Sequence, residues 1–151
     1  MRPQCASRAA VAGLAALLIT GCSQPLVSAL HHVPPTTPPV ACNPGLCEIK
    51  VTVNSCTAAG GIVVDMPYVS TNASVVMRWT ITTPGYAFTS NGIQFDPPDT
   101  QFIVVPDGRP NVFQVLNQHR VTSSTPYYYY VNVETTSGSA CLQADPFILN
   151  N

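Results

Sequence analysis

The sequence predicts an all-β fold: a single small antiparallel β-sandwich, with a small β-barrel as the alternative. Three observations support this. Glu48–Ser55 and Ser74–Thr82 alternate between apolar and polar residues, as half-buried strands do. Further short apolar segments follow, separated by turn-forming pairs of glycine, proline, asparagine and aspartate. No segment keeps a helical period of about 3.6 residues over about ten positions.

The first 21 residues have the organisation of a secretory signal. Arg2 and Arg8 give the start of the chain a positive charge, and no acidic residue occurs there. The apolar run Ala9–Ile19 follows and is too short to span a bilayer comfortably. We therefore expect residues 1–21 to direct export and to be removed.

The end of this run, Ile19-Thr20-Gly21-Cys22, resembles the lipobox of bacterial lipoproteins at all four positions. The resemblance implies a diacylglyceryl group on the Cys22 thiol, cleavage before Cys22, and acylation of the new amino group. Two or more acyl chains, at about 0.8 kcal/mol per buried CH₂, hold a protein firmly to a membrane. By analogy with enterobacterial sorting, Ser23 in place of aspartate favours the outer membrane, facing the periplasm. The alternative is an ordinary signal peptide with Cys22 as a chance thiol.

Residues 22–41 are expected to form a lipidated cysteine and a proline-rich tether. Ser23–Ala41 contain five prolines and no charge. Such a density of proline favours an extended chain, and the segment would reach roughly 60 Å. It would hold a domain away from the membrane, unless Val27–Leu30 pack on that domain. His31 and His32 lack a third ligand, so a solvated pair is favoured over a metal site.

The charge of the remaining chain argues against binding to nucleic acid. Two of the six basic residues belong to the signal, which leaves four basic and seven acidic side chains, a formal net charge of −3. Binding to phosphates needs clustered bases, and these four are scattered. Residues 42–151 are then enough for one β-domain with one core.

Six further segments join the two alternating ones as expected strands, which gives seven or eight short strands in all. They are Gly61–Val64, Gly92–Phe95, Gln101–Val105, Asn111–Asn117, Tyr127–Glu134 and Pro146–Leu149. Turn signals separate them at Ala59–Gly61, Pro84-Gly85, Asn91-Gly92, Asp96–Asp99, Asp107-Gly108 and Ser137-Gly138.

Four cysteines remain in the domain and predict two disulfides, which is typical of an exported protein. Of the three possible pairings we favour Cys42–Cys47, because Pro-Gly between them forms a tight turn. Cys56 then pairs with Cys141, closing a long loop whose entropy is worth about 4–5 kcal/mol. The spacings do not resemble those of a zinc site.

The order Cys56, Trp79, Cys141 is similar to that of the immunoglobulin core, where a disulfide packs on a buried tryptophan. Trp79 lies on an alternating segment and is expected to be buried. The cysteines fall near strand ends and are far apart for that pattern. The resemblance therefore implies an immunoglobulin-like architecture, and no function.

The candidate catalytic and metal-binding residues form no recognisable set. His119 is the domain's one histidine, and no Gly-x-Ser-x-Gly motif accompanies it. His119, Met66 and Met77 do not make a copper site when the cysteines are oxidised. Asp96 and Asp99 form a close pair in a proline loop, for which a rigid turn is favoured over a calcium or catalytic site. We therefore expect no enzyme, no cofactor and no metal.

Four consecutive tyrosines, Tyr127 to Tyr130, are the most informative feature of the domain. On a strand, neighbouring side chains point to opposite faces. If Tyr129 faces the core, then Tyr128 and Tyr130 face outward and form a candidate binding face for protein or carbohydrate. The alternative is ordinary packing between neighbouring strands, and it is favoured.

Two classes of function follow. The first is an anchored binding or scaffolding module that contacts another envelope protein, and it rests on the tether and the tyrosines. The second is an envelope hydrolase inhibitor or small-ligand binder that acts through a protruding loop, around Asp96–Asp99 or Asp107–Pro110.

Overall fold

The computed structural model describes residues 36–151. Over these residues the chain forms ten β-strands and no helix, and hence no helix that is able to cross a membrane. The expected signal sequence, the lipobox with Cys22, and the pair His31 and His32 lie outside the described residues.

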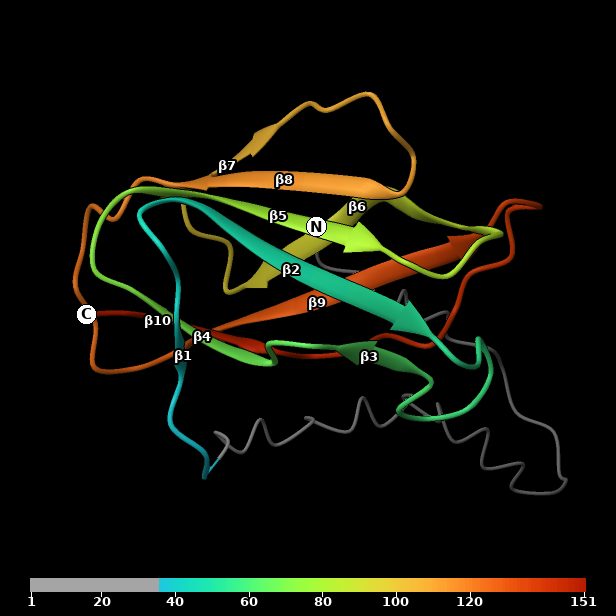
Figure 1. Ribbon diagram of the computed structural model, residues 1–151, viewed down its shortest axis with the longest axis horizontal. Coiled ribbons are helices and arrows are strands. Elements are labelled where there is room, and N and C mark those ends of the chain that lie inside the picture. The colour runs from blue at the N-terminus through green and yellow to red at the C-terminus, as the bar shows by residue number, and fades with distance from the viewer. Residues whose placement is uncertain (1–35) are drawn as a thin grey trace, which may run out of the picture. The chain divides into compact units, whose positions relative to one another are not determined.

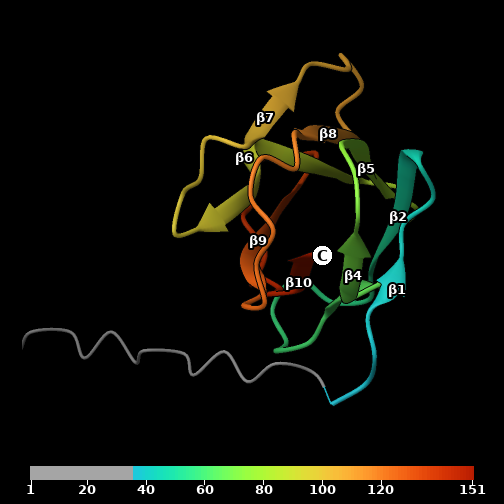
Figure 2. The same cartoon turned by 90° about the vertical axis from the view of Figure 1, so that its left-hand side faces the viewer.

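Two five-stranded sheets face each other and enclose the core (Figure 1 and Figure 2). Sheet A has the order β1-β4-β10-β9-β6, and sheet B has the order β3-β2-β5-β8-β7. The predicted all-β, two-sheet arrangement is confirmed, and the sheets are open rather than closed into a barrel. The strands are β1 (Val40–Ala41), β2 (Gly45–Val53), β3 (Ile62–Val64), β4 (Tyr68–Thr71), β5 (Val75–Ile81), β6 (Tyr86–Asp96), β7 (Phe102–Val105), β8 (Val112–Asn117), β9 (Tyr127–Thr135) and β10 (Phe147–Asn150).

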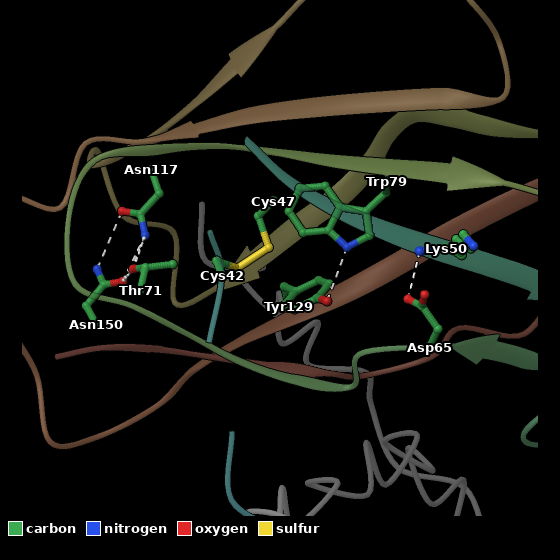
Figure 3. The surroundings of a disulfide bond; sticks show 9 residues. All are labelled: Cys42, Cys47, Lys50, Asp65, Thr71, Trp79, Asn117, Tyr129 and Asn150. Carbon is green, nitrogen blue, oxygen red and sulfur yellow. Dashed lines mark hydrogen bonds between the residues drawn. A yellow bond between two sulfur atoms is a disulfide. The ribbon is translucent and has the colours of Figure 1, made fainter. Parts of the chain in front are cut away.

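The core is built from the alternate residues of each strand that point between the sheets. β5 buries every second residue from Val75 to Ile81, as predicted, and Trp79 is completely buried. Tyr129 of β9 is also completely buried, and the Trp79 Nε1 donates a hydrogen bond to its hydroxyl at 3.2 Å (Figure 3). One hydrogen-bonded aromatic pair therefore joins β5, the central strand of sheet B, to β9 of sheet A.

Three strand pairs are parallel, which corrects the prediction of an antiparallel sandwich. β2 pairs with β5, β1 with β4, and β4 with β10. After the β2–β3 hairpin the chain crosses to sheet A as β4, and it returns to sheet B as β5 beside β2 and in the same direction. Parallel pairing needs such a crossover, and the alternation of apolar and polar residues within one strand does not predict which strands will pair in parallel.

Each of the eight predicted segments overlaps a strand, and β1 and β4 are two more. The expected turn at Asn91-Gly92 is wrong, because both residues lie inside β6. The pairing of β6 with β9 shifts there, between Phe88 and Ile93. A Cβ on Gly92 would lie 2.6 Å from the Phe113 ring and 2.7 Å from the Phe88 Cβ. Gly92 therefore allows the strand to pack closely at this bulge, where a larger residue would clash with Phe88 and Phe113.

Both predicted disulfides form, and each joins the two sheets. Cys42 follows β1 of sheet A and bonds to Cys47 in β2 of sheet B (Figure 3). Gly45 between them has a φ of 91°, a conformation that glycine adopts without strain. Cys56 follows β2 and bonds to Cys141, which follows β9. β1 itself uses Val40–Ala41, two residues that the sequence assigns to the tether.

A cluster of buried polar side chains also joins the sheets. Thr71 of β4, Asn117 of β8 and Asn150 of β10 meet at one end of the sandwich (Figure 3). Asn150 Oδ1 accepts hydrogen bonds of 2.8 Å from both the Thr71 hydroxyl and the Asn117 amide. Asn150 in turn donates to Gln101 Oε1 at 2.9 Å. All four residues are at most 2% exposed, and each makes at least one hydrogen bond to another member of the cluster.

Candidate functional site

The tyrosines of β9 divide between the two faces of sheet A, as predicted. Tyr129, Val131 and Val133 point into the core and are buried, whereas Tyr128 and Tyr130 lie on the solvent face and are partly exposed. β9 is the fourth of the five strands of sheet A and pairs with the edge strand β6 on one side and with β10 on the other, so both tyrosines have a neighbouring strand on each side.

An aromatic row crosses the solvent face of sheet A. Phe147 of β10 is opposite Tyr128 in β9 and opposite Tyr68 in β4. The Phe147 ring centroid lies 5.0 Å from that of Tyr128 and 6.2 Å from that of Tyr68, and both contacts are edge-to-face. Phe147 is only 8% exposed because the two tyrosines cover it. The predicted packing of aromatic side chains between neighbouring strands is therefore present, and it leaves Tyr68 and Tyr128 at the surface.

A carboxylate lies next to this row. The Tyr130 hydroxyl donates a hydrogen bond to Asp96 Oδ2 at 3.0 Å, and Asp96 is opposite Tyr128 in the pairing of β6 with β9. Burial, together with the hydrogen bond to Asp96 and its negative charge, raises the pKa of Tyr130. The same hydrogen bond restricts the position of the Tyr130 ring. We call Tyr68, Tyr128, Tyr130, Phe147 and Asp96 the tyrosine face.

Amide side chains continue the same face beyond Tyr130. Asn132 Nδ2 donates to the Asn91 carbonyl at 2.7 Å, and Gln143 Nε2 donates to Asn132 Oδ1. These residues and Gln94, which is opposite Tyr130, line a hollow of about 470 Å³. A second, mainly apolar hollow of about 320 Å³ borders Phe147.

This arrangement is suited to binding. The rings provide rigid apolar area, and the hydroxyls, the amides and one carboxylate provide hydrogen-bonding groups at fixed positions. The two hollows provide concave surface next to these side chains. Such a combination is typical of surfaces that recognise a protein or a carbohydrate.

His119 is part of the fold rather than of this face. Its backbone has a φ of 49°, its N–H donates to Asn117 Oδ1 at 3.0 Å, and its Nε2 lies 3.1 Å from the Thr71 carbonyl oxygen. His119 therefore covers the buried polar cluster between β4 and β8. Among residues 36–151, no group of three or more histidine, cysteine or acidic side chains is placed to hold a metal ion.

The structure separates the two aspartates of the proline loop. Asp96 accepts from Tyr130, as above, whereas Asp99 accepts hydrogen bonds from the backbone and the side chain of Gln101, at 2.9 and 3.1 Å. In the second predicted loop, the Asp107 carboxylate accepts from Arg109 Nη2 at 2.9 Å and also from the Gln114 amide. Arg109 lowers the pKa of Asp107, chiefly through this hydrogen bonding. In each loop the aspartate carboxylate therefore accepts hydrogen bonds that hold the loop in one conformation.

Several residues of the site are missed by sequence reasoning. Phe147 meets Tyr128 through the antiparallel pairing of β10 with β9, and Tyr68 joins them through the parallel pairing of β4 with β10. Neither pairing has a local signal in the sequence. Asn132 and Gln143 are ordinary surface residues in the sequence. Phe147 alone carries a signal, because it falls in a predicted strand next to proline.

No protein-family model matches the chain, and no curated protein matches its sequence.

Proposed function

We propose that this protein is an exported, non-catalytic binding module, anchored to the bacterial outer membrane through a lipid on Cys22, that captures another envelope protein. The observation that carries the binding proposal is the tyrosine face, in which two partly exposed tyrosines are held by an edge-to-face ring contact and by an aspartate hydrogen bond. Rigid tyrosines lose little entropy on binding. The two disulfides support export, because they persist in oxidising compartments.

The immunoglobulin-like description belongs to this proposal as well. Two packed sheets with a buried tryptophan between them support it. It concerns architecture alone, and no function is attached to it.

The test is crosslinking in intact bacteria, followed by affinity capture of the full-length chain. The double change Tyr128→Ser and Tyr130→Ser is expected to reduce capture of the dominant partner by about ten-fold or more, as for residues at the centre of an interface. Thr80→Ala, on the solvent face of sheet B, is the matched control and is expected to capture normally. Cys22→Ser separates the anchor from the binding face. Capture that is unchanged by the double variant would contradict the proposal.

One observation favours the alternative, an envelope hydrolase inhibitor. The loop that contains Asp107 is held in one conformation by the contacts of that carboxylate with Arg109 and Gln114, and inhibitory loops benefit from such preorganisation. Under this alternative Arg109→Ala abolishes inhibition of the target hydrolase, and the tyrosine variants leave it unchanged.

A further inference from the structure

An unbroken row of aliphatic side chains crosses the solvent face of sheet B. Leu46 of β2 is paired with Val76 of β5, Val76 with Leu116 of β8, and Leu116 with Ile103 of β7. Paired residues on neighbouring strands point to the same face. We call Leu46, Val76, Leu116 and Ile103 the aliphatic stripe.

The position of the stripe is not explained by the core. The face that Leu46 and Ile103 occupy points away from sheet A, and these two end residues are 37% and 42% exposed. The next row along the same strands carries Glu48, Arg78 and Gln114, as expected for a face in water. Val76 and Leu116 between them are half-buried, and a contiguous apolar stripe with exposed ends on such a face is typical of an interaction surface.

The charges around the stripe balance, whereas those of the rest of the domain do not. Glu48 and Arg78 form an ion pair of 3.2 Å beside the stripe, and the side chain of Gln114, which is opposite Arg78, donates a hydrogen bond to Asp107 and so places that aspartate at the border of the same face. Three bases and three acids belong to this face and its borders: Lys50, Arg78, Arg109, Glu48, Asp65 and Asp107. The remaining charges of residues 36–151 are one base against four acids: Arg120, Asp96, Asp99, Glu134 and Asp145.

This distribution favours a second copy of the chain as the occupant. Residues 36–151 carry a formal net charge of −3, so two copies of the domain repel each other through most approaches, but they meet without net charge through the solvent face of sheet B. Four strands spaced about 4.8 Å apart and three rows of side chains give about 400 Å² per copy. The total of about 800 Å² is below that of stable interfaces, at about 1,200 Å², and predicts a weak dimer that forms at high local concentration.

We propose that two copies of this protein associate through the solvent faces of sheet B, with their aliphatic stripes in contact. The contact is isologous, because the same surface is used by both copies. It leaves the tyrosine face of sheet A open in each copy. This self-association involves sheet B, whereas the proposed partner-binding function involves sheet A, so the two proposals are independent of each other.

The experiment is site-specific photo-crosslinking of the full-length chain in intact bacteria that express two differently tagged copies. p-Benzoylphenylalanine at Ile103 is expected to give a crosslinked species that carries both tags. The same crosslinker at Val121, which is 57% exposed and lies outside the stripe, is the control position and is expected to give none. Migration of the monomer on non-reducing gels checks that each variant forms its disulfides.

Two further changes test the contact and its charge balance. Leu46→Ser, in the chain with the crosslinker at Ile103, is expected to reduce the two-tag species about ten-fold, because each copy loses apolar burial. Lys50→Glu makes the solvent face of sheet B negative and is also expected to reduce the amount of the two-tag species. Arg120→Glu changes the net charge of the chain by the same amount, but away from this face, and is expected to leave the amount of the two-tag species unchanged. A crosslink only to another protein or to lipid, equal crosslinking from Val121, or no crosslink would each overturn the proposal.

Discussion

Replacement of Tyr129 by phenylalanine tests the buried aromatic pair that joins the two sheets. The change removes one oxygen, keeps the ring, and leaves the Trp79 indole N–H without the acceptor that lies 3.2 Å away. Both side chains are completely buried, so water does not replace the lost acceptor. An unsatisfied buried donor costs about 1–3 kcal/mol, which is a large share of the free energy of unfolding of a small domain. For a domain of this length the Tm is expected to fall by about 4–10 °C.

The assay is urea unfolding followed by fluorescence, because Trp79 is the only tryptophan of the chain. Tyr130→Phe is the matched control: it also loses one hydroxyl hydrogen bond, but at the surface, and its cost is expected to stay below about 0.5 kcal/mol. If Tyr129→Phe is no less stable than Tyr130→Phe, the pair does not hold the sheets together as described.

Three more predictions concern the same scaffold. Burial raises the pKa of Tyr129, so the folded chain keeps a proton that the unfolded chain releases above about pH 10. The free energy of unfolding therefore falls as the pH rises above that value, by about 1.4 kcal/mol per pH unit for this group. The urea midpoint of Tyr129→Phe is expected to fall less steeply with pH in that range than the midpoint of the unchanged chain. Replacing Cys56 and Cys141 by alanine removes a link between residues 85 positions apart and is expected to lower the free energy of unfolding by about 4–5 kcal/mol; an unchanged urea midpoint would contradict this. Asn117→Ala leaves several buried groups without partners and is expected to cost about 3 kcal/mol by calorimetry or urea unfolding, whereas a loss under about 1 kcal/mol would show that the polar cluster is dispensable.

The parts of the fold that depend on one strand at a time are predictable from the sequence. The alternation in β5 buries Trp79, and that in β9 sends Tyr129 inward and Tyr128 outward, because side chains on a strand alternate strictly. The pairing of Cys42 with Cys47 follows from the Pro-Gly turn between them.

The parts that depend on which strands become neighbours are not predictable in this way. Tyr68 reaches the tyrosine face because β4 pairs in parallel with β10, a choice that is set by the packing of the whole domain. Asn117 and Asn150 are buried, although isolated asparagines usually lie at the surface, because each is the hydrogen-bond partner of the other. Asn91-Gly92 has the composition of a turn, but the Phe113 ring packs against Gly92 and the strand continues.

The central claim is that the tyrosine face captures a partner in the envelope, and the most direct measurement is photo-crosslinking from that face in intact bacteria. p-Benzoylphenylalanine at Tyr128 of the full-length chain is expected to give one dominant crosslink to another envelope protein. The same crosslinker at Thr80, on the opposite face of the sandwich, is expected not to give that product. The claim is contradicted if the same products form from both positions, or if Tyr128 yields only crosslinks to lipid and abundant bystanders.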